Sequence, residues 1–279
     1  MIKETGTWRF INSGAQDGAF NMAADETLAR LCKSGQPILR IYAWQPFAIS
    51  IGHHQKLFEV DLDKCNGQGV DVVRRPTGGR AIFHVEEVTY AVIIPKESNL
   101  YAQSALAIYN FISSALVNGL NRLGANLVLE RKKNLDGEFK TNNQKFACFA
   151  SSAKYEIHYL SKKLVGSAQR RLENALLQHG SILLGNEHLN LFDYLTKTKN
   201  GSSGNLKQLL SKKTTCLETT LNREVNYNEV VSVLKPGFEN VFKIELQSIP
   251  LTAEETELIN ERKPHYSQTR RDSLCETCV

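Results

Sequence analysis

Short apolar stretches bounded by turn residues recur through the first 184 residues, and they predict β-strands. Many of their side chains are β-branched, as is typical of strands. Pro46 separates the second stretch from the third, and Pro95 ends the fifth. We expect the last three stretches to form a further sheet. The predicted strands lie at residues 8–11, 38–44, 47–51, 70–75, 87–94, 126–130, 155–160, 163–168 and 176–184.

Helical periodicity marks two longer segments between these strands. Residues 20–32 place apolar side chains on one face and stop before the Gly-Gln-Pro turn at residues 35–37. Residues 101–123 show the strongest helical pattern, and Gly124 follows as a C-cap. Residues 131–145 are polar and charged, which predicts a mobile loop that could become ordered when a partner protein binds.

The pattern changes near residue 196, where a linker rich in lysine, glycine and serine begins and runs to residue 205. Thr252 and Glu255 form a capping box that predicts a helix toward Arg262, and Pro236-Gly237 is expected to break the helix before it. We therefore predict an α+β protein, with mixed β-sheets flanked by helices and a small C-terminal helical appendage. Residues 1–196 would form the core, and residues 197–279 a linker and a helical segment packed on it.

Composition narrows the classes of partner. The 279 residues carry a formal net charge of +5 and a sequence pI of about 8.8, which suits an acidic protein or a phosphorylated ligand. No stripe of basic residues alternates with aromatics, so nucleic acid is not expected. Neither a hydrophobic leader nor a membrane-spanning run is present, which predicts a cytoplasmic protein without membrane contact. The scattered cysteines suit a reducing compartment, and Cys275 and Cys278 are either reactive tail thiols or a zinc or disulfide clip.

The run RRPTGGRAIFH at residues 74–84 is the most informative motif. It joins two predicted strands through Gly78 and Gly79, which lack a Cβ and so let a ligand approach backbone N–H groups. Arginines on both sides supply fixed positive charge for phosphate or carboxylate. An ordinary tight turn is the alternative for the glycine pair itself.

Two residues further along the chain could supply reactive groups. Cys148 is a candidate nucleophile, although a lone cysteine is more often a buried structural thiol. Lys163 could activate that thiol or stabilise an oxyanion, although a solvated strand lysine is the ordinary interpretation. A loop suited to phosphate, together with a thiol and an amine, indicates acyl transfer from a phosphorylated carrier.

Three runs together resemble one known superfamily. Residues 74–84 resemble the signature loop of the lipoate–protein ligase, octanoyltransferase and biotin ligase superfamily. KLVGSAQ at residues 163–169 resembles its lysine signature, and DGAFNMAADE at residues 17–26 resembles its N-terminal helix entry. The resemblance covers residues 8–184, and it implies the catalytic-domain fold of that superfamily.

Two departures from the ATP-dependent ligases narrow the resemblance. Arg80 stands where those ligases usually have a third glycine, and Cys148 stands in the region of their usual Asn-Asp pair. Both features resemble the cysteine-dependent octanoyltransferases. The resemblance then implies that Cys148 accepts the acyl group and that Lys163 is its partner, acting either as an acid or base or only through its charge.

The same resemblance implies the partners and the binding residues. The donor would be octanoyl acyl carrier protein, and the acceptor the glycine cleavage H protein or another lipoyl domain. No metal, ATP or other cofactor is expected. The sequence itself shows no exposed coiled-coil seam, so we expect a monomer. A tunnel for the eight-carbon chain would include Tyr90 and Phe83. The substrate-binding residues would be Arg75, Thr77, Gly78, Gly79, Arg80, His84, Gly166 and Ala168.

Several alternatives remain at this point. His84 either contacts the acyl donor or holds the loop by a hydrogen bond, and His179 is either a core residue or part of the pocket wall. An ATP-dependent lipoate ligase would not need Cys148. A silent module that binds acylated carriers would need neither Cys148 nor Lys163. Transfer from one lipoylated domain to another would use the same chemistry.

Overall fold

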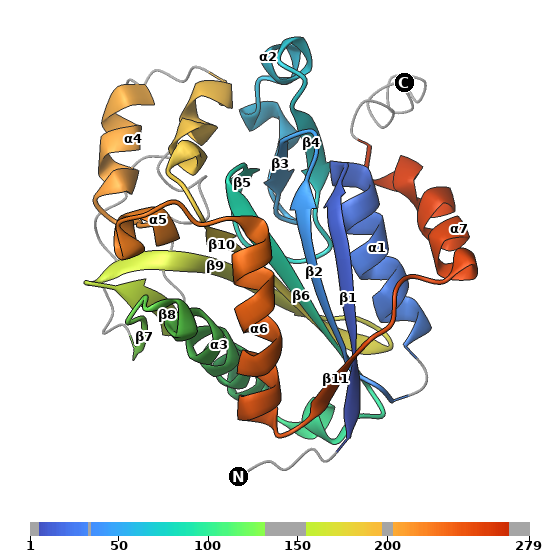
Figure 1. Ribbon diagram of the computed structural model, residues 1–279. Coiled ribbons are helices and arrows are strands. Elements are labelled where there is room, and N and C mark those ends of the chain that lie inside the picture. The colour runs from blue at the N-terminus through green and yellow to red at the C-terminus, as the bar shows by residue number, and fades with distance from the viewer. Residues whose placement is uncertain (1–5, 33–34, 132–154, 197–202, 268–279) are drawn as a thin grey trace.

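A mixed sheet of eight strands forms the centre of the molecule (Figure 1). The computed structural model describes residues 6–32, 35–131, 155–196 and 203–267. The strand order in the sheet is β11-β1-β2-β6-β10-β9-β8-β7. The strands are β1 (Thr7–Gln16), β2 (Ile38–Trp44), β6 (Glu87–Pro95), β7 (Val128–Arg131), β8 (Tyr155–Tyr159), β9 (Lys162–Arg171), β10 (Ala175–Leu183) and β11 (Glu245–Ser248).

Two long strands, β6 and β10, form the middle of this sheet. Every residue of both strands is buried, which explains their nearly continuous apolar sequences. They pair antiparallel along their whole length, from Ala175 opposite Pro95 to Leu183 opposite Glu87. Because β9 pairs with the other edge of β10, the strands after residue 155 extend the same sheet. The expectation of a further sheet in this region is therefore wrong.

A second sheet has three strands in the order β4-β3-β5 and lies at one end of the main sheet (Figure 1). Its strands are β3 (Ala48–Ile51), β4 (Asp71–Arg74) and β5 (Ile82–His84). Strand β3 pairs parallel with β4 and antiparallel with β5. The loop at residues 75–81 therefore connects two strands that flank β3, which places both ends of the loop beside one rigid element.

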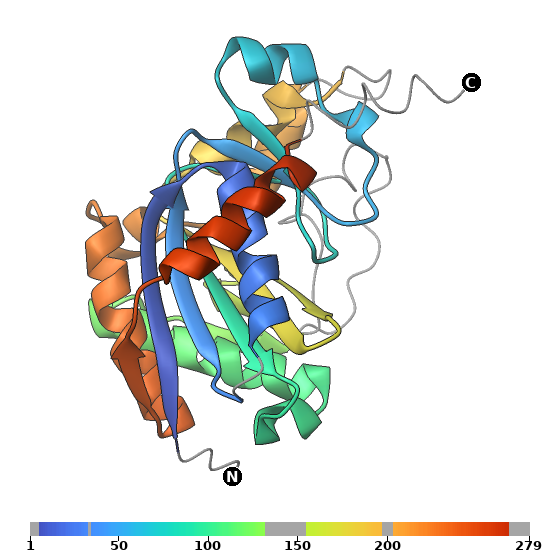
Figure 2. The same ribbon diagram turned by 90° about the vertical axis from the view of Figure 1, so that its right-hand side faces the viewer.

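Helices cover both faces of the main sheet. Helices α3 (Ala105–Leu120) and α6 (Tyr227–Phe242) pack on one face, and α1 (Gly18–Leu31) and α7 (Ala253–Arg262) lie together on the other (Figure 2). The shorter helices are α2 (Leu62–Gly67), α4 (Ser203–Ser211) and α5 (Leu217–Leu221). Single 3₁₀ turns occupy Leu57–Glu59, Asn99–Ala102, Asn121–Leu123 and Lys263–His265, and Glu187–Tyr194 forms a longer 3₁₀ segment.

The predicted break at Pro236-Gly237 is wrong, because α6 continues through both residues. Tertiary packing accounts for the difference. An added Cβ on Gly237 would lie 2.6 Å from the Cα of Gly119 in α3, so the two helices meet at their backbones. The apolar side chains that α3 and α6 bury around this contact outweigh the hydrogen bond that proline removes.

The C-terminal part contributes a strand as well as helices. Strand β11 pairs parallel with β1, with Thr7 opposite Glu245. The predicted capping box is present at the start of α7, where the Thr252 side chain accepts from the backbone N–H of Glu255 and the Glu255 side chain accepts from that of Thr252. The predicted boundary after residue 196 falls at residues 197–202, outside the described residues, and stays a prediction. Within the described ranges, no helix is long and apolar enough to span a membrane.

Candidate active site

A register shift between β8 and β9 decides which way Lys163 points. Ile157 pairs with Val165, but the next residue of β8, His158, pairs with Lys163, so β9 carries one extra residue, Leu164. Both Leu164 and Val165 pack in the core cluster that α3 and α6 cover. Two successive side chains on the same face are the mark of a β-bulge, and the bulge turns Lys163 to the opposite face.

Lys163 therefore shares the face of the sheet that α1 covers. Gly166 and Ala168 lie on the same face, since Ala168 pairs with His179, whose side chain contacts α1. Only 6% of Lys163 is exposed, and its Nζ lies 2.8 Å from Oε1 of the fully buried Glu156. A charged amine is thus held inside the protein on the face that carries the second signature. Cys148 lies outside the described residues.

The loop at residues 75–81 is held to β3 by one buried guanidinium. Arg75 donates from Nη1 to the backbone carbonyl of Ser50 at 3.1 Å and to its hydroxyl at 3.0 Å. Its Nε donates to the carbonyl of Gly78 at 3.1 Å, and its Nη2 to the carbonyl of Arg80 at 2.6 Å. Arg75 thus ties both ends of the glycine turn to the neighbouring strand, while the side chain of Arg80 is half-buried.

A second contact fixes the loop through Thr77. His179 Nδ1 lies 2.8 Å from Oδ2 of Asp25, and His179 Nε2 lies 2.6 Å from the Thr77 hydroxyl. Since the carboxylate accepts, Nδ1 carries the hydrogen and Nε2 accepts from Thr77. Burial lowers the pKa of His179, which keeps the ring neutral. Burial alone would raise the pKa of Asp25, but hydrogen bonding from His179 and the charge of Arg40 lower it overall.

His84 links a carboxylate to a hydroxyl in the same way as His179 does, on the other side of Arg75. Its Nδ1 lies 2.7 Å from Oε1 of Glu87, and its Nε2 lies 2.6 Å from the Ser50 hydroxyl, which Arg75 also contacts. The ring stacks on Trp44 with centroids 3.9 Å apart. Of the two roles open for His84, the geometry shows the hydrogen bond that supports the loop. Because Ser50 and Thr77 are both fully buried, these carboxylate–imidazole–hydroxyl series position the loop and do not present a nucleophile.

The glycine pair makes the close packing of the loop possible. Gly79 has φ +89°, a left-handed conformation that favours glycine. Its carbonyl oxygen would lie 2.0 Å from a Cβ placed on Gly52, so the loop touches the backbone immediately after the end of β3. A Cβ on Gly78 would meet nothing within 4 Å, so the backbone there faces open space.

A small cavity, which we call the sheet hollow, lies beneath the loop. Trp44, His84, Gly166, Ala168 and His179 are among its lining residues, and its volume is about 20 Å³. This is roughly the space of a single water molecule, and Arg75 of the loop is one of the residues that line the hollow.

The predicted tunnel residues lie elsewhere. Tyr90 points to the α3 and α6 face, where it lies 2.7 Å from the hydroxyl of Ser167, and Phe83 packs against Tyr194 in another cluster. Neither residue is among those that line the sheet hollow, because the alternation of side chains along their strands turns both away from it. Their place in a tunnel for the octanoyl chain stays a prediction.

A basic groove of about 410 Å³ adjoins the loop on its outer side, where Arg75 and Pro76 belong to its wall. Among the described lining residues Glu26 is the single carboxylate. Burial, followed by the charges of Arg170 and neighbouring basic groups, lowers the pKa of His53 in this wall. We call this feature the arginine groove; its basic residues are Arg30, His53, Arg74, Arg75, Arg170, Arg262 and His265.

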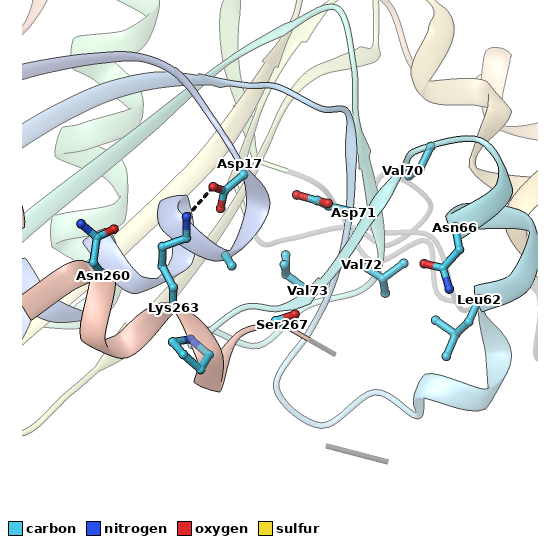
Figure 3. Close-up of a pocket in the computed structure, with 12 residues that line it drawn as sticks. Asp17, Leu62, Asn66, Val70, Asp71, Val72, Val73, Asn260, Lys263 and Ser267 are labelled. Atoms are coloured by element: carbon cyan, nitrogen blue, oxygen red, sulfur yellow. Dashed lines mark hydrogen bonds and ion pairs between the residues drawn. The ribbon is translucent and has the colours of Figure 1, made fainter. Parts of the chain in front are cut away.

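A larger groove of about 640 Å³ lies between the start of α1, β4 and the C-terminal turn (Figure 3). Lys263 donates to Asp17 at 2.6 Å (Figure 3). Asp71 accepts from the backbone N–H of Gly18 at 2.9 Å. Burial raises the pKa of Asp71, and the nearby Asp17 charge adds to this effect. Asp17 caps the start of α1 and, through Lys263, holds the 3₁₀ turn at Lys263–His265, so this groove has a structural role. Of the predicted site residues that the structure describes, none lines it.

The structure brings together most of the predicted site residues. Arg75, Thr77 and His84 converge through hydrogen bonds around the loop, and Gly166 and Ala168 line the sheet hollow. Sequence reasoning missed the carboxylates and imidazole that hold these groups: Asp25, Glu87, Glu156 and His158. The spacing of Glu156 and His158 on one strand was the available signal, because residues two apart share a face.

Known proteins resemble this chain in both sequence and fold. The model of the lipoyl protein ligase A/B catalytic domain matches residues 17–239. A curated relative from Clostridioides difficile, octanoyltransferase LipM, is 38% identical over 93% of this chain and 96% of its own length. The protein of the same name from Staphylococcus aureus is 32% identical over 94% of this chain and 96% of its own length.

Solved structures show the same fold at lower sequence identity. Lipoate–protein ligase A bound with ATP is similar with a TM-score of 0.72, at 22% identity, over 92% of this chain and 94% of its own. The bipartite lipoate protein ligase of Thermoplasma acidophilum reaches 0.72 at 21% identity, covering 92% of both chains. These likenesses confirm the predicted α+β fold with flanking helices. By the family model and the curated relatives together, the chain belongs to the lipoyl protein ligase A/B catalytic-domain family.

Proposed function

We propose that this chain, an octanoyltransferase of lipoate biosynthesis by its family and its relatives, takes its octanoyl group from acyl carrier protein and passes it to a lysine of a lipoyl-accepting protein. The acceptor we propose is the glycine cleavage H protein or a similar lipoyl domain. The observation that carries the proposal is the buried Lys163 amine, which a β-bulge turns toward the face of the sheet hollow. The relatives named octanoyltransferase, 31–38% identical over most of the chain, support the same reaction.

The proposed reaction has two steps. The Cys148 thiolate attacks the octanoyl thioester, the carbon–sulfur bond to the carrier breaks, and the carrier leaves as a thiol. The neutral amine of the acceptor lysine then attacks the Cys148 thioester, forms an amide and returns the Cys148 thiol. Lys163 would stabilise the thiolate by its positive charge or donate the proton that the leaving thiol takes up.

We assign the loop and the hollow to substrate binding. The octanoyl chain would enter the sheet hollow between Gly166, Ala168 and His84, and the exposed backbone at Gly78 and Gly79 would face the thioester. An eight-carbon chain needs far more room than one water molecule, and we propose that the loop moves outward to provide it when the donor binds. Such a movement would lengthen the hydrogen bond from Arg75 to the carbonyl of Arg80 and the one from Thr77 to His179.

The arginine groove supports the proposed partners. Arg75 is buried, but the other four arginines and one carboxylate among the described lining residues create a positive surface beside the loop. Such a surface attracts acidic proteins and raises their association rate, particularly at low ionic strength. We therefore propose that a carrier protein approaches over this groove.

Intact-mass spectrometry tests the proposal directly. The wild-type protein, Cys148→Ala and Lys163→Met are each incubated with octanoyl acyl carrier protein in the absence of ATP. We expect one octanoyl adduct on the wild type, none on Cys148→Ala, and adduct formation slowed about 10²–10⁴-fold on Lys163→Met. An apo lipoyl domain should then remove the adduct from the wild type.

Two results would contradict the proposal. A wild-type protein that acquires no adduct, yet modifies the lipoyl domain when ATP and free octanoate are added, is an ATP-dependent ligase. A protein that binds the acylated carrier without reacting under either condition is a binding module.

A further inference from the structure

Four polar side chains form a continuous series across three neighbouring strands. Glu130 of β7 lies 2.8 Å from Nδ1 of His158 in β8, and His158 Nε2 lies 3.2 Å from Oε2 of Glu156. The other carboxylate oxygen of Glu156 lies 2.8 Å from Nζ of Lys163 in β9. The series therefore runs from the edge of the sheet to the amine that the proposed reaction uses.

Burial separates this series from an ordinary surface ion-pair network. Glu156 is fully buried, and His158 and Lys163 are 1% and 6% exposed, whereas the side chain of Glu130 is 39% exposed. Both oxygens of Glu156 are engaged, one by His158 and one by Lys163, so its carboxylate plane has a fixed orientation. The orientation of the Lys163 amine follows from that of Glu156.

Stability does not account for this arrangement. Glu130 and Glu156 are direct partners across β7 and β8, and like charges in that position destabilise a sheet. Burying an ion pair is often no better for stability than packing apolar residues of similar volume. His158 lies between the two carboxylates, and each of its ring nitrogens faces one of them. A costly set of buried charges that ends on Lys163 is expected where the position of that amine matters.

We propose that Glu156 and His158 are positioning residues for Lys163, and that Glu130 supports His158 from the solvent side. Glu156 holds the Lys163 amine by a charged hydrogen bond, and His158 prevents the Glu156 side chain from rotating away. This inference rests on the proposed function, because it takes Lys163 to act on the Cys148 thiol.

The test compares single-turnover octanoylation in Glu156→Gln, Glu156→Asp, His158→Gln and Lys163→Met. A displacement of an amine by about 1 Å can slow a reaction about 10²-fold. We expect Glu156→Gln to slow octanoylation about 10²-fold and His158→Gln about 10-fold, with the KM for the donor unchanged within about twofold. Glu156→Asp, which restores the charge, should recover part of the loss.

A second readout separates positioning from a general loss of structure. Carboxamidomethylation of the Cys148 peptide, followed by mass spectrometry, reports how reactive that thiol is in the folded protein. We expect the rate to fall in Glu156→Gln, His158→Gln and Lys163→Met alike, because a loosely held amine stabilises the thiolate less. Loss of structure would act the other way and expose buried thiols such as Cys65 to the reagent.

A matched control is Glu255→Gln, which neutralises the carboxylate partner of Arg9 in another largely buried ion pair. Glu255→Gln should keep wild-type rates in both assays. Wild-type rates in both Glu156→Gln and His158→Gln, with Lys163→Met slow, would overturn the positioning role while leaving the proposed function intact. If Lys163→Met is as fast as the wild type, the role of Lys163 fails and the inference falls with it. Should Glu156→Gln not fold, the rate of His158→Gln decides.

Discussion

Gly52→Ala tests whether the loop must stay in contact with the neighbouring strand. An alanine Cβ at this position would lie 2.0 Å from the carbonyl oxygen of Gly79 and 2.9 Å from its carbonyl carbon. Ordinary contact begins at 3.4 Å, so the loop would have to move by about 1.4 Å. The atoms that the new Cβ would meet belong to the loop backbone. The side chains of Arg75 and Thr77 hold that loop in place with hydrogen bonds as short as 2.6 Å.

A loop displaced by this distance should affect the reaction more than the fold. Overpacking of this kind costs about 1–3 kcal/mol, which for a protein of this size lowers Tm by about 2–10 °C. Misplacement of a substrate-positioning loop by more than 1 Å should slow octanoyl transfer about 10²-fold. The two quantities are measured by thermal unfolding and by single-turnover adduct formation with octanoyl acyl carrier protein.

Gly67→Ala is the matched control for this substitution. It adds the same methyl group at the end of α2, where a Cβ would meet nothing within 4 Å, so both the rate and Tm should stay at or above wild type. A Gly52→Ala protein with wild-type Tm and rate would refute the reasoning, because it would show that the loop can leave β3 freely. Equal losses in the Gly67→Ala protein would refute it as well.

Three further predictions concern stability and partner binding. Burial lowers the pKa of His188 to about 4, below the ordinary value of 6.5, so the unfolded chain takes up this proton first. The free energy of unfolding should therefore fall by about 3 kcal/mol as the pH drops from 6.5 to 4, and urea titrations should show a smaller fall in His188→Gln. Gly237→Ala should destabilise the protein by about 1–3 kcal/mol in the same titrations, because its Cβ would meet the α3 backbone, whereas Gly204→Ala in open space should not. Raising the ionic strength should lower kcat/KM for the octanoylated carrier about 10-fold, and Arg30→Ala should flatten that dependence. A small octanoyl thioester without a carrier protein should show no such salt effect, and a salt effect shared by both donors would count against the groove.

The local sequence pattern was sufficient to predict most helices and strands, but not to predict how they pack together. The predicted strands at residues 38–44 and 87–94 match β2 and β6 closely, because nearly complete burial makes their sequences almost continuously apolar. Which sheet a strand joins depends on partners far away in the sequence, so the placement of β8 and β9 in the main sheet was not predictable. The helix through Pro236 depends on the contact between Gly119 and Gly237, which no local pattern displays.

At the candidate site, too, the local sequence predicted some features, whereas others depend on residues far away in the chain. The loop residues were predictable from glycine and arginine chemistry, and Lys163 from its resemblance to the lysine signature. The direction of Lys163 was not, because the bulge at Leu164 interrupts the alternation on which strand predictions depend. The support that Asp25 and Glu87 give to His179 and His84 comes from other elements, so it becomes visible only in three dimensions.

The pairing of β1 with β11 has a consequence for the order of folding. The outer edge of β1 receives its partner from residues about 238 positions later in the chain, as the pairing of Thr7 with Glu245 shows. During synthesis the outer edge of β1 at residues 7–10 therefore waits with its N–H and C=O groups unpaired until nearly all of the chain has been made. Such long-range closure slows folding and leaves a template for association with other chains. Truncation before residue 245 should thus yield aggregates rather than a smaller soluble enzyme, although residues 75–81 and Lys163 would still be present.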